Sequence, residues 1–239
     1  MDLNNQSEIT AYDAHALEML LNGKFNLNIL EIGSWFGQGS TSILSGFAKQ
    51  IVCVDTWKGN NIDTHNKILS ISDPFIQFEK NTNSLGCKII PIKCDSLDAS
   101  FIIKDSFFDF IFVDSCHGYS HVIRELNLYY NKLKPGGTIA GHDCEGRICE
   151  YIGCLNKEDF DKDSIKSPSA KFLEIHPGVI KAVSEFFGEN VSYFSDDKNM
   201  IDYHGVRGHS TIWYHTKPKN SAKRLYFVLK NLVIRQLGT

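Results

Sequence analysis

The side chains best suited to chemistry in this chain stand at the ends of short apolar runs. Five such runs, at 28–33, 50–55, 88–95, 108–114 and 138–143, each contain or end in a carboxylate. Runs of this kind, alternating with helical segments, are typical of parallel strands, whose carboxyl ends meet at one edge of a sheet. The side chains expected at that edge are Glu31 with Gly33, Asp55, Asp95 with Ser96, Asp114, and His142 with Asp143. Such a crevice suits a ligand that carries hydroxyls and a positive charge, or a bound cation.

The first strand end opens into a glycine loop, Glu31-Ile32-Gly33-Ser34-Trp35-Phe36-Gly37-Gln38-Gly39-Ser40-Thr41. Glycine lets backbone approach a ligand closely, and Ser40 or Thr41 can cap the following helix. The spacing differs from the GxGxxG of dinucleotide-binding folds, and an acid before the first glycine repels a pyrophosphate but attracts an amino group. Asp55 is placed to accept hydrogen bonds from ribose hydroxyls. A nucleoside with an aminoacyl chain, S-adenosylmethionine (SAM), fits both features.

The elements that must position these residues follow in a strand–helix alternation. Helical periodicity is expected at 7–21, 40–49, 119–133 and 179–187, and two further strand-like pieces lie at 191–194 and 211–215. Pro91 lacks a backbone donor and therefore predicts an edge position or a bulge for its strand. The pattern predicts an α/β fold, Rossmann-like and doubly wound, with a mostly parallel seven-stranded sheet and helices on both faces.

Two segments stand apart from this alternation. Residues 144–176 are polar and irregular, which predicts an inserted lid within a single domain spanning 1–221. Residues 222–239 predict a basic, amphipathic C-terminal helix, since no Asp or Glu occurs from Tyr203 to Thr239. Such a helix can dock on the domain or on a second copy, so a homodimer is among the expectations.

Composition narrows the class of protein further. The 239 residues carry a formal net charge of −3, with 42% hydrophobic and 22% charged residues, which is ordinary for a globular chain. No apolar run is long enough to span a bilayer, so no stable membrane insertion is expected. The part before the basic tail is acidic, which argues against a nucleic-acid partner. Seven cysteines without a CxxC pair, and no signal peptide, predict a reduced, cytoplasmic location.

Several motifs together resemble class I SAM-dependent methyltransferases. They are the glycine loop at 31–41, Asp55-Thr56-Trp57-Lys58-Gly59, Phe78 with Asn81, Val113-Asp114-Ser115-Cys116-His117-Gly118-Tyr119, Leu133-Lys134-Pro135-Gly136-Gly137, Gly141-His142-Asp143, and Pro177-Gly178-Val179. The group they resemble most is the one related to macrolide-sugar O-methyltransferases and cephalosporin-hydroxylase-like proteins. The resemblance covers roughly residues 28 to 187.

The resemblance implies a role for each matching position. Glu31, Gly33, Ser34, Gly37 and Ser40 would hold the methionine part of SAM. The other cofactor-binding positions it implies are Asp55 at the ribose, Thr56 and Trp57 beside the adenosine, Asp95 and Ser96 at the adenine, and Asp114. Metal-dependent relatives hold magnesium at the places of Asp114, His142 and Asp143.

One departure from the family pattern affects the expected mechanism. Relatives often read Asp-Gly-Asp-His-Ser-Tyr where this chain places Cys116 at the second acid. His117, with an ordinary pKa of about 6.5, then becomes the expected general base, with Asp114 beside it. Mg²⁺ prefers oxygen ligands, so His142 makes Mn²⁺ or Fe²⁺ an alternative ion.

The expected reaction is metal-assisted methyl transfer from SAM to a hydroxyl of a small molecule or a sugar, the acceptor class being inferred by analogy. Two alternatives stay open at this point. A metal-dependent hydroxylase-like enzyme on the same scaffold would use the Asp114, His142 and Asp143 cluster for iron, since one histidine with two carboxylates resembles an iron site. A non-catalytic SAM-binding module would lack a working base at 116–117.

Overall fold

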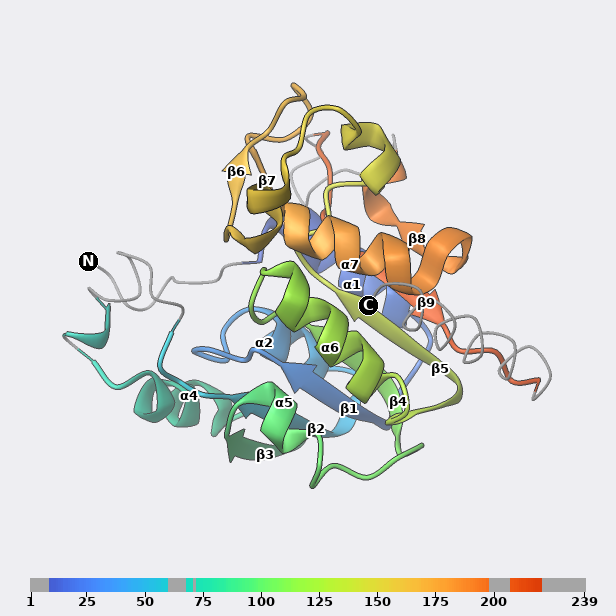
Figure 1. The fold of residues 1–239 in the computed structure, drawn as a ribbon. Helices are drawn as coiled ribbons and strands as arrows, with labels where there is room; N and C mark the ends of the chain where they lie inside the picture. Colours follow the sequence, from blue (N-terminus) through green and yellow to red (C-terminus); the bar gives the residue numbers. More distant parts are fainter. Residues whose placement is uncertain (1–8, 60–67, 71, 198–206, 221–239) are drawn as a thin grey trace.

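A seven-stranded sheet forms the centre of the molecule (Figure 1). The computed structural model describes residues 9–59, 68–70, 72–197 and 207–220. The strand order is β3-β2-β1-β4-β5-β9-β8; β1 to β5 are parallel, and β9 is antiparallel to β5 and β8. The strands are β1 (Leu27–Ile32), β2 (Ala48–Asp55), β3 (Lys88–Lys93), β4 (Phe108–Val113), β5 (Leu133–Gly141), β8 (Ser192–Tyr193) and β9 (Trp213–Thr216). The predicted mostly parallel sheet is thereby confirmed.

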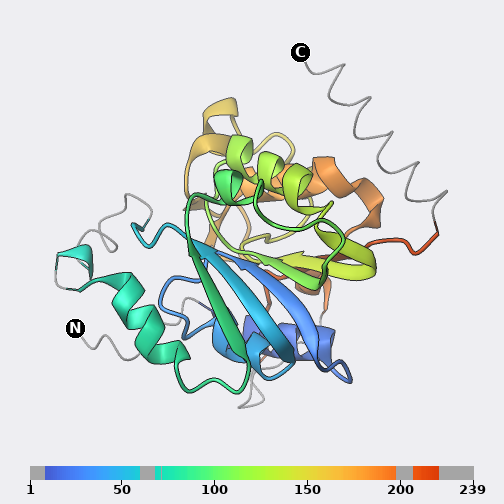
Figure 2. The same cartoon turned by 90° about the horizontal axis from the view of Figure 1, so that it is seen from below.

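Helices cover both faces of the sheet, as Figure 2 shows. Leu17 of α1 and Phe78 of α4 belong to the hydrophobic cluster on one face, where they pack with strand residues such as Phe110. Leu126 of α6 and Ile180 of α7 belong to the cluster on the other face. The helices are α1 (Ala11–Leu21), α2 (Ser40–Ser45), α4 (Pro74–Thr82), α5 (Ser96–Ala99), α6 (Tyr119–Tyr129) and α7 (Pro177–Phe187).

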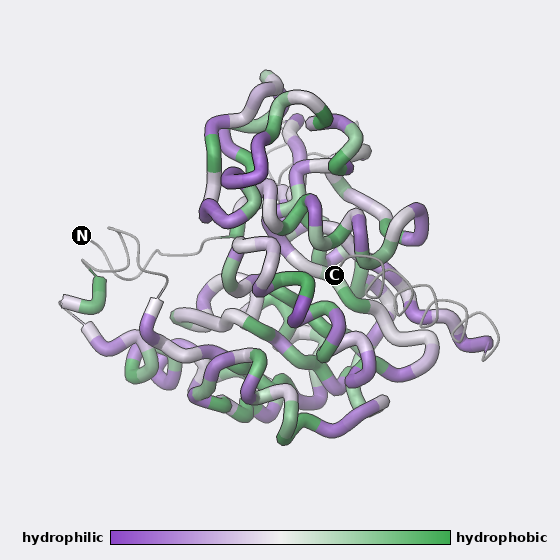
Figure 3. The backbone as a smooth tube through the Cα atoms, in the orientation of Figure 1, coloured by the Kyte–Doolittle hydropathy of each residue, from purple (hydrophilic) through white to green (hydrophobic). Residues whose placement is uncertain are grey.

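Strand burial follows the apolar runs of the sequence. In β4, Phe108, Phe110, Ile111, Phe112 and Val113 are all buried, which is what a strand covered on both faces requires. Figure 3 shows hydrophobic residues along these central strands and hydrophilic residues along the outer loops. β3, which contains Pro91, is the edge strand of the sheet, as the missing donor predicted.

Several element boundaries differ from the predicted ones, and those of α2, α6 and β5 lie closest to the site. The helix expected at 40–49 ends at Ser45, because Ala48 already pairs with Leu27 of β1 and the pairing draws the chain into β2. The helix expected at 119–133 ends at Tyr129. β5 begins at Leu133, so the Lys-Pro-Gly-Gly segment lies within the strand rather than before it, where the register with β4 shifts.

The predicted lid, residues 144–176, lies over the end of the sheet that carries the predicted site (Figure 1). It contains two short 3₁₀ helices, η2 (Ile148–Tyr151) and η3 (Lys157–Asp161), and a small antiparallel ribbon of β6 (Ile165–Lys166) and β7 (Glu174–Ile175). Among the described helices, none combines the length and apolar character needed to cross a bilayer. The predicted helix at 222–239 and the domain boundary before it lie outside the described residues.

Candidate functional site

A cavity of about 490 Å³ opens at the carboxyl ends of the parallel strands. It is bordered by the glycine loop after β1, the ends of β2 and β3, and the segments after β4 and β5. The sequence-predicted residues that line it are Gly33, Ser34, Gly37, Ser40, Asp55, Thr56, Asp95, Ser96, Asp114, His117, His142 and Asp143. Twelve of the fourteen predicted site residues therefore line the same cavity, as their positions at the strand ends predicted.

The glycine loop is held in shape by backbone contacts and by one carboxylate. Gly33 has a φ of +86°, and a Cβ at this position would lie 1.8 Å from the backbone oxygen of Asp114. Oδ2 of Asp55 accepts hydrogen bonds from the backbone N–H groups of Ser34 (3.0 Å) and Trp35 (2.8 Å). Asp55 thus fixes the loop that borders the cavity, in addition to lining the cavity itself.

Glu31 and Trp57 lie behind the residues that line the cavity, and their direct contact with the cofactor stays a prediction. Glu31 is fully buried behind the glycine loop, where its Oε2 accepts a hydrogen bond from Thr41 (2.6 Å). Trp57 is only 3% exposed, packs against Phe78, and donates its ring N–H to the backbone oxygen of Trp35 (2.7 Å). Both side chains support the loop from behind.

The burial of Glu31 has an electrostatic consequence. Burial raises the pKa of this carboxyl to about 6, although the hydroxyls of Ser40, Thr41 and Ser34 lower it in part. Oε1 of Glu31 is buried without a hydrogen-bond partner, which agrees with a group that is costly to ionise here. The acid is therefore close to half-ionised in mildly acidic solution.

The far end of the cavity, next to β3, is built on a buried carboxylate that the sequence analysis missed. Asp95 caps α5 by accepting the backbone N–H of Leu97 (2.9 Å). Glu125 of α6 is fully buried and accepts hydrogen bonds from the hydroxyls of Ser96 and Ser115. His121, one turn earlier on α6, contacts Glu125 (3.1 Å) and lines the cavity. Four residues from three elements thus fix this wall.

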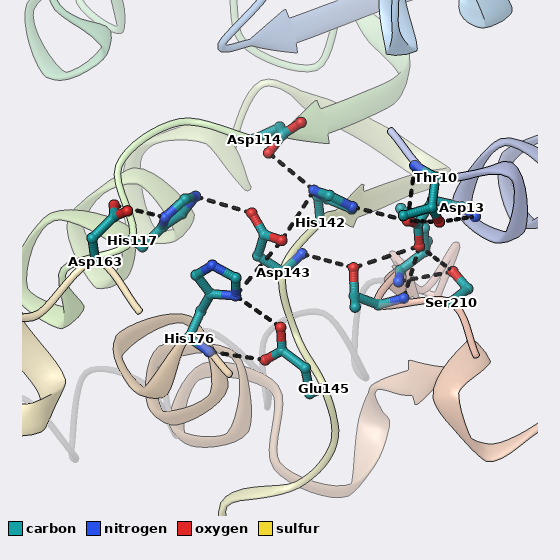
Figure 4. A network of polar contacts seen from close by, with 12 residues as sticks. Thr10, Asp13, Asp114, His117, His142, Asp143, Glu145, Asp163, His176 and Ser210 are labelled. Carbon is teal, nitrogen blue, oxygen red and sulfur yellow. Dashed lines mark hydrogen bonds and ion pairs between the residues drawn. The ribbon is translucent and has the colours of Figure 1, made fainter. Parts of the chain in front are cut away.

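The opposite end of the cavity is a polar network centred on Asp143 (Figure 4). Nδ1 of His142 lies 3.2 Å from Oδ1 of Asp143 and 3.5 Å from Oδ1 of Asp114. Nε2 of the same ring faces Oδ2 of Asp13, on α1, at 3.1 Å. Asp143 adopts a φ of 56°, a left-handed conformation that is unusual for a residue other than glycine and occurs often at functional sites. The structure therefore unites the three predicted metal ligands.

His117 joins the same network from the loop after β4. Its Nε2 lies 3.0 Å from Oδ2 of Asp143, and its Nδ1 lies 2.9 Å from Oδ1 of Asp163, which the lid contributes. Burial alone would lower the pKa of His117, but the hydrogen bonds and charges of the two carboxylates outweigh it and raise the pKa well above the ordinary value. Both ring nitrogens of His117 thus face carboxylates, and its role as the general base stays a prediction.

Four residues of this network escaped the sequence analysis: Asp13, Glu145, Asp163 and His176. His176, at the last position of the lid, places Nδ1 2.8 Å from Oε1 of Glu145 and 3.6 Å from Oδ1 of Asp143. Its ring packs edge-on to that of His117, with 4.6 Å between centroids. The local sequence feature that could have indicated His176 is its position directly before Pro177 and the following helix.

The donor set at Asp114, His142 and Asp143 fits a divalent cation. One ligand atom from each residue lies within 4.8 Å of the others. Asp13 holds one ring nitrogen of His142 and leaves Nδ1 directed at the two carboxylates, the arrangement by which a second carboxylate orients a ligating imidazole. Two carboxylates and one imidazole suit Mn²⁺ or Fe²⁺ as well as Mg²⁺.

The strand order, the antiparallel β9 and the ligand crevice at the strand ends define the class I methyltransferase fold. A protein of Staphylococcus aureus assigned as a caffeoyl-CoA O-methyltransferase has this fold, with a TM-score of 0.54 and 14% identity over 85% of this chain and 82% of that one. So does a phosphoethanolamine N-methyltransferase of Haemonchus contortus, solved with phosphoethanolamine and S-adenosylhomocysteine, with a TM-score of 0.52 and 13% identity over 95% of this chain and 47% of that one. At such identities the likeness concerns the fold.

The sequence itself matches a family as well. Residues 30–144 match the model of a methyltransferase domain family, and this segment contains the glycine loop and the carboxyl ends of the five parallel strands. Residues 30–144 are therefore similar to a methyltransferase domain, and the chain has the fold of solved methyltransferases. A curated relative, an uncharacterised protein of Acanthamoeba polyphaga mimivirus, is 33% identical over 140 residues, which are 54% of this chain and 58% of that protein.

Proposed function

We propose that this protein transfers the methyl group of SAM to a hydroxyl of a small molecule or sugar, with assistance from a divalent metal ion. The observation that carries the proposal is one continuous cavity with two chemically different ends. One end has the glycine loop and Asp55; the other has Asp114, His142 and Asp143. A methyl donor and an acceptor hydroxyl can thus be held in one space.

The donor end suits the parts of SAM in sequence along the strand ends. Gly33 and Ser34 present backbone to the aminoacyl chain, Asp55 and Thr56 face the ribose, and Asp95 with Ser96 borders the adenine. The order of the strands supports this assignment, because β1, β2 and β3 are neighbours and their ends form one line.

The acceptor end supplies positioning and charge. A divalent cation held by Asp114, His142 and Asp143 would lower the pKa of a hydroxyl that it binds and fix that hydroxyl in line with the methyl group. In the transfer, the bond from methyl carbon to sulfur breaks as the bond from acceptor oxygen to methyl carbon forms, and S-adenosylhomocysteine leaves. The acceptor's proton must go to a nearby group.

We assign that proton to Asp114 rather than to His117. The carboxylate of Asp114 contacts His142 at 3.5 Å, whereas His117 already faces two carboxylates within hydrogen-bonding distance. An oxygen of Asp114 is therefore open toward the cavity that it lines. His117 instead lies between Asp143 (3.0 Å) and the lid residue Asp163 (2.9 Å) and so connects the end of β5 to the lid.

The test is methyl transfer from isotopically labelled SAM to a panel of catechols and sugars, with and without a chelator. We expect a labelled O-methyl product, loss of its formation after metal removal, and a fall of about 100-fold or more in kcat for Asp114→Asn. Asp105→Asn, at an exposed residue paired with Lys132, is the matched control and should leave the rate unchanged. Methylation on nitrogen, or an O-methylation rate insensitive to Asp114 and to the chelator, would overturn the proposal.

A further inference from the structure

Three imidazoles in the acceptor end are each backed by a carboxylate. Asp13 faces Nε2 of His142 (3.1 Å), Asp163 faces Nδ1 of His117 (2.9 Å), and Glu145 faces Nδ1 of His176 (2.8 Å), as Figure 4 shows. In metal sites of proteins, a histidine that binds the ion commonly donates its other ring N–H to a carboxylate in this way, as the rings of His117 and His142 are placed to do, whereas Nδ1 of His176 faces both Glu145 and, at 3.6 Å, Asp143. The three pairs lie around a further carboxylate, that of Asp143.

The predicted metal ligands account for only one of these three imidazoles. His117 and His176 form a second group with Asp143, in which one ligand atom from each residue lies within 4.8 Å of the others. The three side chains are only 15–16% exposed, so they are neither solvated surface groups nor sealed in the core. Oδ2 of Asp143 faces His117 (3.0 Å), whereas Oδ1 faces both His142 (3.2 Å) and His176 (3.6 Å), so this carboxylate belongs to both groups.

The charge of the network also favours bound cations. It contains five carboxylates, those of Asp13, Asp114, Asp143, Glu145 and Asp163, and three imidazoles, those of His117, His142 and His176. A net negative charge remains even when every imidazole carries a proton. Side chains that are mostly buried tolerate such a charge poorly unless it is neutralised by an ion or a ligand.

We propose that His117, Asp143 and His176 form a second divalent-metal site, specific for transition-metal ions that accept imidazole nitrogen, through which the lid is fastened to the sheet. Two histidines and one carboxylate are the donor set of catalytic zinc sites and of non-haem iron sites, and an ion that demands oxygen ligands is disfavoured here. The site shares Asp143 with the metal site of the proposed methyl transfer, and it adds His117 and His176, which that transfer does not need.

The origin of the ligands explains the structural effect of the ion. His117 follows β4 and Asp143 follows β5, so both belong to the rigid end of the sheet. His176 is the last residue of the lid, directly before α7. An ion bound to all three therefore ties residues 144–176 down over the cavity, with Glu145 and Asp163 orienting the rings from within the lid itself.

The test is the number of Zn²⁺ ions bound per chain, measured by titration calorimetry on the metal-stripped full-length protein. We expect two ions for the wild type, one for His176→Ala and for His117→Ala, and none of high affinity for Asp143→Asn, because Asp143 serves both sites. His209→Ala is the matched control, since His209 also packs on the lid, against Phe172, but belongs to neither group, and it should bind two ions.

A second readout separates metal binding from folding and from catalysis. Each variant is titrated with S-adenosylhomocysteine, whose contacts lie at the other end of the cavity; unchanged binding shows that the fold is intact. Limited proteolysis within 144–176 should slow several-fold on adding Zn²⁺ in the wild type and in His209→Ala, but not in His176→Ala. One ion in the wild type, or two in His176→Ala, overturns the second site and leaves the proposed methyl transfer untouched.

Discussion

Nε2 of His142 lies 3.1 Å from Oδ2 of Asp13, although 129 residues separate the two along the chain. Asp13 is 1% exposed and also accepts hydrogen bonds from the hydroxyl of Ser210 (2.7 Å) and the backbone N–H of Thr211 (2.8 Å). The start of α1, the chain before β9 and the end of β5 thus form one polar unit. That unit directs Nδ1 of His142 toward the predicted cation.

Asp13 is not a predicted metal ligand, but replacing it should weaken metal binding through His142. We expect Asp13→Asn to raise the Kd for Mn²⁺ by about 10- to 100-fold, because the orientation of His142 is lost. The Kd for S-adenosylhomocysteine should stay the same. Calorimetric titration of both ligands measures this, with Asp105→Asn as the surface control. An unchanged Kd for Mn²⁺ would show that Asp13 serves the fold alone.

Glu31 should make stability depend on pH. Burial raises its pKa from 4.5 to about 6, so the folded state binds this proton more tightly than the unfolded state does. An acid shifted upward contributes stability at low pH, and that contribution falls between pH 4.5 and about 6 and is absent above. The shift corresponds to about 2 kcal/mol.

Glu31→Gln replaces the carboxyl with an amide that stays neutral, so the variant lacks this pH-dependent contribution to stability. We expect the wild type to lose about 2 kcal/mol of unfolding free energy relative to Glu31→Gln as the pH rises from about 4 to about 8. Urea unfolding of both proteins across that range measures the difference. A difference that does not vary with pH would mean that the burial of Glu31 does not shift its ionisation.

Gly33 and Gly23 provide a matched pair for testing the close approach at the cavity. Both have positive φ, +86° and +74°, but a Cβ on Gly33 would meet the backbone of Asp114 at 1.8 Å, whereas a Cβ on Gly23 meets nothing within 4 Å. Gly23→Ala should cost about 1–2 kcal/mol from backbone strain alone. Gly33→Ala should cost clearly more and abolish binding of S-adenosylhomocysteine. Equal losses of Tm in the two variants would argue against the tight packing of the loop on β4.

The parts of the fold that sequence predicted correctly depend on local pattern. Continuous apolar runs identified the five parallel strands, and Pro91 identified the edge strand, because a missing donor is a property of the residue itself. The helix after the glycine loop was predicted too long, since Ala48 is held by pairing with β1 rather than by its own preference. Pairing of this kind depends on the register of a distant strand.

The candidate site was predictable at the strand ends and not beyond them. Asp114, His142 and Asp143 come together because the sheet brings them there. In the structure Asp13 forms a capping box with Thr10 at the start of α1, a local role that gives no indication of its contact with His142. Asp163 lies 46 residues after its partner His117, inside a lid with no periodic pattern. No local rule indicates which lid side chain faces inward.

The most direct test of the central claim is calorimetric titration of the purified protein with S-adenosylhomocysteine, beside Asp55→Ala and the control Asp73→Ala. Asp55 holds the glycine loop through Ser34 and Trp35, whereas Asp73 only caps α4 at the surface. We predict saturable binding at one site per chain, weakened at least about 10-fold in Asp55→Ala and unchanged in Asp73→Ala. Absence of binding at millimolar ligand, or equal affinity in all three proteins, would contradict the assignment of this cavity to SAM.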